Sequence, residues 1–341
     1  MRRQYADLKV DDLRTGDLQG HHRLRRTLSI RLALQRGIVC SPEQVFVTAG
    51  LQGAMALITE AVLSAGEAVI VEDPGDPKCR EALRRAGARL VPAAVDENGM
   101  RVDQALSSAP EARLALVMPS AQFPLGVALS GGRRERLLKW ARGSGAWIVE
   151  RDLHSHFRFA GTPAPALASQ DRHGRVLYTI DFSDILFPGL RLGCVVVPPE
   201  QVERFRGAVA RIALQPGWSD QAALAEFIRF GHIGRYLARS LEVCRRRRQA
   251  LLEAIAKVSP STAVYAPDAG LHLLVALDHP LTDASRARLH AFGLAPTPMT
   301  TCAPSESAQP TLLVGFGSTP VHAAEHAIAA MLEALRSPPR A

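Results

Sequence analysis

The chain has 341 residues, a formal net charge of +8 and an ordinary apolar fraction of 47%. No run approaches the roughly 20 apolar residues that a membrane-spanning helix requires. The polar start Met1–Asp7 also lacks the apolar segment of a signal peptide. These features argue against a membrane or secreted protein. They predict a cytoplasmic protein with room for one large and one smaller domain.

The positive charge comes from arginine, because the chain contains only four lysines: Lys9, Lys78, Lys139 and Lys257. Arginine richness by itself is a weak sign of nucleic-acid binding. The densest run, Arg245–Arg248, lies in a helical pattern and indicates a solvated helix face, with an anion-binding face as the alternative. Five scattered cysteines without CxxC spacing favour free thiols over disulfides or a zinc site.

Helices and short β-branched strands alternate through the first two thirds of the chain. A helix over residues 23–35 follows the turn-rich stretch Gly16–Gly20, and further helices are expected up to residue 65 and at 77–86 and 132–142. Strands are expected at 45–48, 68–72, 89–91, 114–118, 147–150, 176–180 and 192–197. This alternation predicts an α/β fold with a mainly parallel sheet covered on both faces, and a ligand site beyond the carboxyl ends of the strands.

The pattern changes after Pro216. Two long helices are expected at 219–230 and 232–257, followed by strands at 271–277 and 311–315 and a closing helix at 322–335. The tail Ser337–Ala341 is expected to fray. The sequence therefore predicts an N-terminal segment over residues 1–30, a large domain over 31–216 and a smaller α+β domain over 217–341.

Several segments carry a pattern in a fixed order. They are GDLQG (16–20), PEQVFVTAG (42–50), VEDPG (71–75), PSAQFPLG (119–126), AWIVE (146–150), DFS (181–183), LFPGLRLG (186–193) and AGLH (269–272). The series resembles the aminotransferase-like domain of MocR-type proteins, a branch of the GntR regulators whose effector domain is a fold-type I aminotransferase. The resemblance extends from about residue 14 to about residue 335.

The resemblance implies a fold-type I architecture, with a mainly parallel sheet of the seven-stranded type in the large domain and a smaller α+β C-terminal domain. It also implies pyridoxal phosphate and a dimer with its site at the subunit interface. We expect a small-molecule ligand and a homodimer. No winged-helix domain stands ahead of residue 14, so a nucleic-acid partner is not expected unless the gene begins further upstream.

The cofactor contacts of that fold are altered at four positions. Pyridoxal chemistry requires a lysine amine for the imine and an acid beside the pyridinium nitrogen. By the resemblance, Asp184 stands in place of the lysine and Arg151 in place of the acid. Leu153 replaces a tyrosine that contacts the ring oxygen, and Asp76 replaces the tyrosine that stacks on the ring. A carboxylate cannot form an imine, so transimination by the usual route is lost. A one-residue shift of the alignment would let Asp152 recover the acid.

Part of the phosphate-binding frame is retained. By the resemblance, Ser183 and Arg191 match its serine and arginine, and Gln52 belongs to the loop that cradles the phosphate at a helix start. Gln122 fills the position that faces the ring oxygen. A retained turn, with its arginine satisfied by carbonyl groups, explains Ser183 and Arg191 equally well. No arginine for a substrate carboxylate lies within residues 312–316. The candidate cofactor-site residues are Ser183, Arg191, Gln52, Gln122, Arg151 and Asp76.

A new group of polar residues follows a predicted strand end. Asp152, His154 and His156 alternate, and an extended backbone would point all three side chains to one side. Two histidines and a carboxylate are competent metal ligands and acid–base groups, although a rim of surface or hydrogen-bonded histidines is the favoured alternative. The candidate catalytic residues are therefore Asp184, Asp152, His154 and His156, and no metal is assigned. His272 is expected to pack within the small domain.

Three functions stay open. The first is an enzyme of specialised small-molecule metabolism that kept the fold and abandoned imine chemistry. It would act on a phosphate- or carboxylate-bearing ligand held by Ser183 and Arg191, without a covalent cofactor; a non-covalent pyridoxal or pyridoxamine phosphate is left open. The second is a non-catalytic binding or scaffold partner of an active homologue. The third is an ordinary aminotransferase, which would need Lys78 as its amine although this lysine lies in the wrong loop.

Overall fold

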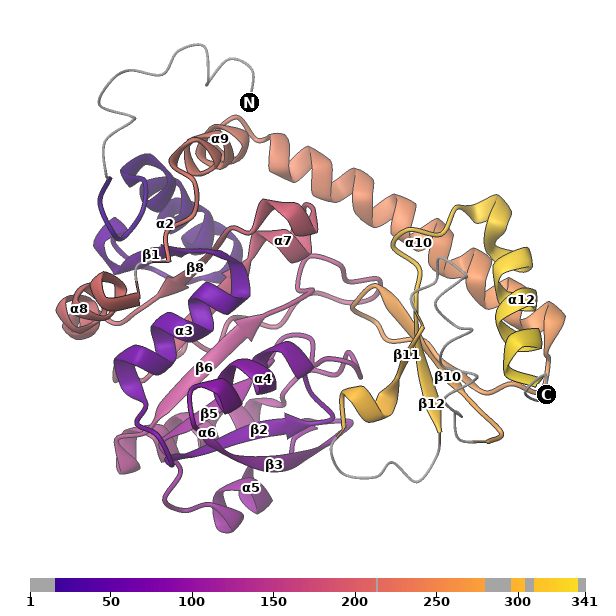
Figure 1. Cartoon of the computed structure of the whole chain (residues 1–341), viewed down its shortest axis with the longest axis horizontal. Helices are drawn as coiled ribbons and strands as arrows, with labels where there is room; N and C mark the ends of the chain where they lie inside the picture. The colour runs from indigo at the N-terminus through magenta and orange to yellow at the C-terminus, as the bar shows by residue number, and fades with distance from the viewer. Residues whose placement is uncertain (1–15, 213, 280–295, 304–309, 337–341) are drawn as a thin grey trace.

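The protein is described by a computed structural model that covers residues 16–212, 214–279, 296–303 and 310–336. The expectations placed on the chain start before residue 16 and on the tail from residue 337 lie outside the described residues. Two sheets organise the chain, a larger one in its N-terminal part and a smaller one in its C-terminal part (Figure 1).

The larger sheet has eight strands in the order β1-β8-β7-β6-β5-β2-β3-β4. Five of them run parallel: β2 (Ala68–Asp73), β3 (Arg89–Asp96), β5 (Leu114–Val117), β6 (Trp147–Asp152) and β7 (Val176–Asp181). Antiparallel pairing joins β8 (Gly193–Val196) to β7, β1 (Val45–Thr48) to β8, and the two-residue β4 (Gly99–Met100) to β3. The predicted mainly parallel sheet is confirmed, and β4 is a short addition to the expected seven strands.

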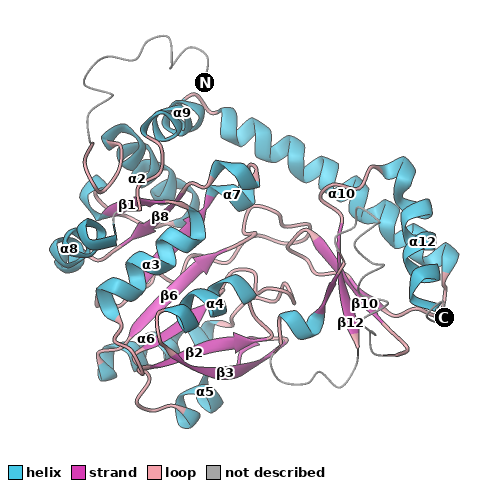
Figure 2. Ribbon diagram, in the orientation of Figure 1, coloured by secondary structure: helices cyan, strands magenta, loops and turns pink. Residues whose placement is uncertain are grey.

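The central strands are buried on both faces because alternate residues contact different helix layers. Val69 and Val71 of β2 pack in a cluster with α3 (Gly50–Val62), α4 (Pro77–Arg85) and α8 (Val202–Ile212). Ala68 and Ile70 of the same strand pack with α5 (Val102–Ser108) and α6 (Gly131–Ser144). Figure 2 shows these helices flanking the sheet, as the alternation of elements predicts.

The first described helix, α2 (His22–Arg36), covers the β1–β8 end of the larger sheet. Leu24, Leu28 and Leu32 share one helix face, because they are spaced by four residues. They pack with β1, β7, β8 and α9 (Trp218–Arg229). The helix ends at Gly37, whose φ of 70° is a left-handed conformation that glycine adopts readily.

The smaller sheet is antiparallel, in the order β11-β12-β10-β9. Its strands are β9 (Val264–Tyr265), β10 (His272–Ala276), β11 (Thr297–Pro298) and β12 (Thr311–Gly315). Two helices, α10 (His232–Val258) and α12 (Ala324–Arg336), pack against one face of this sheet. The predicted smaller α+β part is confirmed.

The long helix α10 connects the two parts of the molecule (Figure 1). Ile233 at its start packs in the cluster around α2, whereas Leu251 and Ile255 pack in the cluster of the smaller sheet. The preceding helix α9 also packs with α2 and the larger sheet. The division of the chain between residues 216 and 217 stays a prediction.

Several short elements escape the sequence-based prediction. They are α5, α8, β4, β9, β11, the four-residue α7 (Phe182–Ile185), and the 3-10 turns at Pro42–Gln44, Pro188–Leu190, Pro199–Gln201, Met299–Thr301 and Val321–Ala323. Most of these helices span one or two turns and the strands have two residues each, which is too short for a periodic apolar pattern to stand out. The exception is α8, where Phe205, Ala208 and Val209 face the sheet at helical spacing.

The arginine run on α10 has local partners. Arg245 and Arg246 pair with Glu242, and Arg247 and Arg248 donate to the carbonyl groups of Gly317 and Ala266. This arrangement agrees with a solvated helix face rather than an anion-binding face. The five cysteines are free, as their spacing predicts. None of the helices in the described ranges has the length and apolar character needed to cross a membrane.

Candidate functional site

One edge of the larger sheet gathers most of the candidate residues. β1 ends there at Thr48, β6 at Asp152 and β7 at Asp181, and the antiparallel β8 begins there at Gly193. The register confirms this meeting point, because Gly193 is opposite both Thr48 and Asp181. Ligands of such sheets bind beyond the carboxyl ends of the strands, and this edge is therefore the candidate site.

Three charged residues from different elements form an ion network at this edge: Arg151 in β6, Asp184 in α7 and Asp76 at the N-cap of α4. The Arg151 Nη2 atom lies 2.8 Å from Asp76 Oδ2 and 3.2 Å from Asp184 Oδ2. The side chains of Arg151 and Asp76 are 3% and 6% exposed, and that of Asp184 is 25% exposed. A charge is costly to bury unless it is paired, so each member of the network depends on the others. The structure thus brings together residues that the sequence assigned to three separate cofactor contacts.

Asp184 is the member of the network that a ligand can reach. Burial is the largest influence on its carboxyl and raises its pKa above the ordinary value, whereas the positive charges of Arg151 and Lys78 oppose that shift. Asp76 has a second partner, because its Oδ1 accepts a hydrogen bond of 2.8 Å from the N–H of Lys78 and so caps α4. The partly exposed carboxyl of Asp184 is the group best placed for acid–base chemistry.

Asp152 lies outside this network. It follows Arg151 in β6, and neighbouring residues of a strand face opposite sides of the sheet. The Tyr178 hydroxyl donates to Asp152 Oδ2 at 2.6 Å, and Arg36 Nε lies 2.8 Å from the same oxygen. Arg36 also donates to Ser120 Oγ at 2.6 Å. Asp152 therefore has the contacts of a buried structural ion pair that holds α2 on the sheet.

The extended backbone expected over residues 152–156 is wrong, because β6 ends at Asp152 and a bend and a turn follow. His154 has a φ of 60°, which lies in the left-handed region. Its ring centroid is 6.4 Å from that of His272. His156 turns elsewhere, with Nε2 3.1 Å from Arg31 Nη2. The two histidines consequently contact different neighbours, and of the two it is His156 whose pKa is influenced by the charges of Asp152 and Arg36.

Burial makes both histidines neutral at physiological pH. It lowers the pKa of His154 to about 3 and that of His156 to about 4. Within the ranges that the structure covers, no three His, Cys, Asp or Glu side chains are grouped to hold a metal ion. His156 is within hydrogen-bond distance of Arg31 and Ser155, whereas the contacts of His154 are with the rings of Phe123 and His272. A catalytic role for His154 or His156 stays a prediction.

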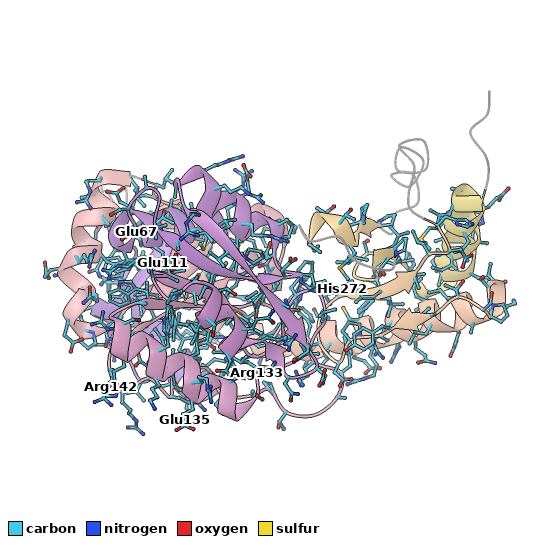
Figure 3. The ribbon with its side chains drawn as sticks, turned by 90° about the horizontal axis from the view of Figure 1, so that it is seen from below. Glu67, Glu111, Arg133, Glu135, Arg142 and His272 are labelled. Carbon is cyan, nitrogen blue, oxygen red and sulfur yellow. The ribbon has the colours of Figure 1, made fainter. Side chains whose placement is uncertain are left out.

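His272 joins the two parts of the molecule, at whose junction it appears in Figure 3. Its Nε2 atom lies 2.7 Å from the carbonyl oxygen of Pro124, and its ring meets Phe123 edge-on with centroids 5.2 Å apart. Gln122 shapes the same loop, because its side-chain amide donates to the carbonyl groups of Pro74 and Phe123 at 2.7 Å each. His272 therefore packs across the junction rather than only within the small domain, and the amide of Gln122 is engaged by backbone.

Asp181 lies between the starts of two helices. Its Oδ2 accepts the N–H of Leu51 in α3 and its Oδ1 accepts the N–H of Ser183 in α7, both at 2.8 Å. Gly50 has a φ of 65°, and a Cβ atom there would lie 3.2 Å from Asp181 Oδ2. The sequence-based prediction missed this residue. A strand-ending Asp directly before a helix is a recognisable N-cap signal, but nothing local reveals that it also caps α3.

The residues of the expected phosphate frame are Ser183 and Arg191, which follow Asp181 in the chain, and Gln52 in α3. The Ser183 Oγ atom is buried and, in the described part of the chain, has no hydrogen-bond partner. Arg191 is exposed and has a φ of 47°. Gln52 is exposed in the first turn of α3. All three stay candidates for ligand binding.

Three features of this edge do not fit a pyridoxal phosphate held as the resemblance implies. The side chain at position 184 is a carboxylate and supplies no amine. The guanidinium of Arg151 stands in place of the acid and would repel a protonated pyridine nitrogen. The N–H of Leu51 at the start of α3 is already bonded to a carboxylate of the chain itself.

Comparison with known proteins adds relatives of two kinds. No family model matches the chain. The chain is 35% identical over 265 residues to the probable rhizopine catabolism regulatory protein MocR of Rhizobium meliloti, which covers 77% of this chain and 53% of that protein. It is 30% identical over 307 residues to the uncharacterized HTH-type transcriptional regulator YhdI of Bacillus subtilis, which covers 89% of this chain and 64% of that protein.

The chain thus spans about half to two thirds of the length of these curated relatives. Among solved structures it matches that of the kynurenine aminotransferase of Pyrococcus horikoshii with a TM-score of 0.85 and 25% identity. That match covers 100% of this chain and 85% of the aminotransferase chain.

Proposed function

Because this chain is a homologue of MocR-type regulators with the fold of fold-type I aminotransferases, we propose that it acts on a small molecule without forming the pyridoxal imine. The proposal depends on the ion pair between Asp184 and Arg151. By the resemblance these two residues replace the imine lysine and the acid beside the pyridine nitrogen. A cation and an anion have thus exchanged places across the site.

This exchange is consistent with a stable alternative site. Arg151 stays positively charged in a protein, so its burial requires a carboxylate nearby. Asp184 and Asp76 supply two, at 3.2 and 2.8 Å. The replacements at positions 76 and 184 thus supply the two carboxylates that the replacement at position 151 requires. The three residues support a site rebuilt as a unit.

The proposed chemistry uses Asp184 as the acid–base group. Its raised pKa brings its titration closer to neutral pH, which suits proton transfer. Ser183 stands next to it with a buried hydroxyl that, among the residues the structure describes, has no hydrogen-bond partner. We assign the protein to small-molecule metabolism, as an enzyme without a covalent cofactor. A cytoplasmic location and the lack of a nucleic-acid partner belong to the same proposal.

A second candidate is a non-catalytic partner of an active homologue. It is favoured by a groove of about 960 Å³ between α2, α9 and the start of α10. Ile30 and Leu34, which line this groove, are 54% and 82% exposed. Exposed apolar side chains that gather on a surface often mark a protein interface. The same surface would serve the homodimer that the resemblance implies.

The test is to mix the purified protein with pyridoxal phosphate, record its absorbance and reduce it with borohydride. We expect no protein-imine absorbance near the visible edge and no mass increase after reduction, whereas an active aminotransferase treated in parallel shows both. A cofactor found covalently attached to any amine of the native protein would instead support the hypothesis that the protein is an ordinary aminotransferase. So would a transaminase turnover that is lost in Lys78→Ala.

A further inference from the structure

The start of α3 has the properties of an anion site. This helix has 13 residues, is largely buried, and directs its N-terminus at the candidate site. Free N–H groups and the helix dipole favour a negative charge at such a terminus. The anion that the structure places there is the carboxylate of Asp181, which accepts the N–H of Leu51 at 2.8 Å.

The space around that carboxylate is closely packed. A Cβ atom on Gly50 would lie 3.2 Å from Asp181 Oδ2 and 3.6 Å from the Arg191 Cα atom, and one on Gly193 would lie 3.2 Å from Thr48 Oγ1. The Thr48 hydroxyl is itself engaged, because it donates to the carbonyl of Gly50 at 3.1 Å. The second oxygen of Asp181 caps α7 through Ser183. Both carboxylate oxygens are therefore fixed by backbone N–H groups.

We infer that Asp181 is a built-in substitute for a phosphate group, so that this site rejects phosphate-bearing ligands, including non-covalent pyridoxal and pyridoxamine phosphate. A phosphate placed at the start of α3 would compete with Asp181 for the N–H of Leu51 and would meet a carboxylate at contact distance. Two like charges at that distance repel strongly in a partly buried site. The inference narrows the ligand class of the proposed function and rests on the same site.

The probes are pyridoxamine phosphate and pyridoxamine, which differ only in the phosphate and carry no aldehyde. Both are titrated calorimetrically into the full chain. In the native protein we expect the phosphate to add no affinity, so that pyridoxamine binds at least as well as its phosphate ester. In Asp181→Asn, which removes the charge and keeps an acceptor oxygen, we expect the phosphate ester to gain about tenfold or more in affinity over pyridoxamine.

A matched control is Asp171→Asn. Asp171 also accepts backbone N–H groups, those of His173, Arg175 and Val176, but in the loop before β7, at the other end of that strand. We expect this variant to behave like the native protein. An equal gain in the control, or no gain in Asp181→Asn, would overturn the inference.

If Asp181→Asn does not fold, the titrations of the native protein alone still test whether the site rejects a phosphate group. A native chain that binds pyridoxamine phosphate about tenfold more tightly than pyridoxamine has an open phosphate site, and the inference then fails while the lack of an imine still stands. A borohydride-stable adduct on the native chain instead contradicts the proposed function. The two failures are therefore distinguishable.

Discussion

The carboxylate of Asp184 lies 3.2 Å from the guanidinium of Arg151. Arg151 belongs to β6, and Asp184 belongs to α7, the short helix that directly follows the adjacent strand β7. In sequence they are separated by the last residue of β6, the loop over residues 153–175 and the whole of β7. The fold makes them neighbours, and it adds Asp76 from the loop after β2. Their mutual dependence leads to the first two predictions.

Replacing Arg151 by Met should destabilise the fold strongly. The change leaves the nearly buried Asp76 and the partly buried Asp184 without their common cation, and removal of one partner from a buried ion pair costs about 3–5 kcal/mol. Urea unfolding measures the effect. Asp184→Asn should cost much less, because a quarter of that side chain is exposed. Equal losses in the two variants would contradict the network.

Replacing Asp184 by Lys should not restore an imine. The new amine would stand against Arg151, and the repulsion between two cations disfavours both burial and cofactor binding. Spectra and borohydride reduction in the presence of pyridoxal phosphate check this. Adding Arg151→Asp, Asp76→Tyr and Asp181→Ser to the same chain should then permit an adduct. Imine formation by the single variant would show that the neighbouring charges are irrelevant.

Tyr178→Phe should cost stability without affecting ligand binding. Its hydroxyl donates to the buried carboxylate of Asp152 at 2.6 Å, and a hydrogen bond to a charged group contributes about 1.5–3 kcal/mol. Thermal or urea unfolding gives the stability, and titration of any ligand found for the site gives the affinity. A marked loss of affinity at unchanged stability would return Asp152 to the catalytic candidates.

His154 should make the native protein sensitive to acid. Its pKa in the fold is about 3, below the ordinary histidine value of 6.5, so between these values the unfolded chain binds more protons than the native one. Stability attributable to the neutral ring is present above pH 6.5 and is lost as the pH falls toward 3. Unfolding curves of native protein and His154→Gln, measured across this range, should converge toward low pH.

The buried Glu72 provides the control for that experiment. Burial raises its pKa to about 8, so its carboxyl is neutral in the folded protein below that pH. The stability that the neutral form contributes is lost as the pH rises from 4.5 toward 8, because the unfolded chain then releases its proton first. The sign is opposite to that of His154. The stability of Glu72→Gln should therefore increase relative to that of the native protein as the pH rises. If the stabilities of Glu72→Gln and His154→Gln changed with pH in the same direction relative to the native protein, both assignments would be contradicted.

Most of the fold was accessible from the sequence. The strands are continuous apolar runs because both faces of the sheet are covered, as the burial of every residue of β2 shows. The long helices α2, α9 and α10 follow from apolar spacing. The backbone at His154 was not accessible, because alternation of polar residues predicts a shared face only if the strand continues, and β6 ends at Asp152.

The candidate site was accessible only in its chemistry. The sequence by itself determined that position 184 carries an acid where imine formation needs an amine, since the reactivity of a side chain is a property of its atoms. Only the tertiary structure decided which charges meet: Asp184 and Asp76 around Arg151, Asp152 with Arg36, and Asp181 at the start of α3. Ion pairs and helix caps depend on distances of a few ångströms between residues remote in sequence, and packing sets those distances.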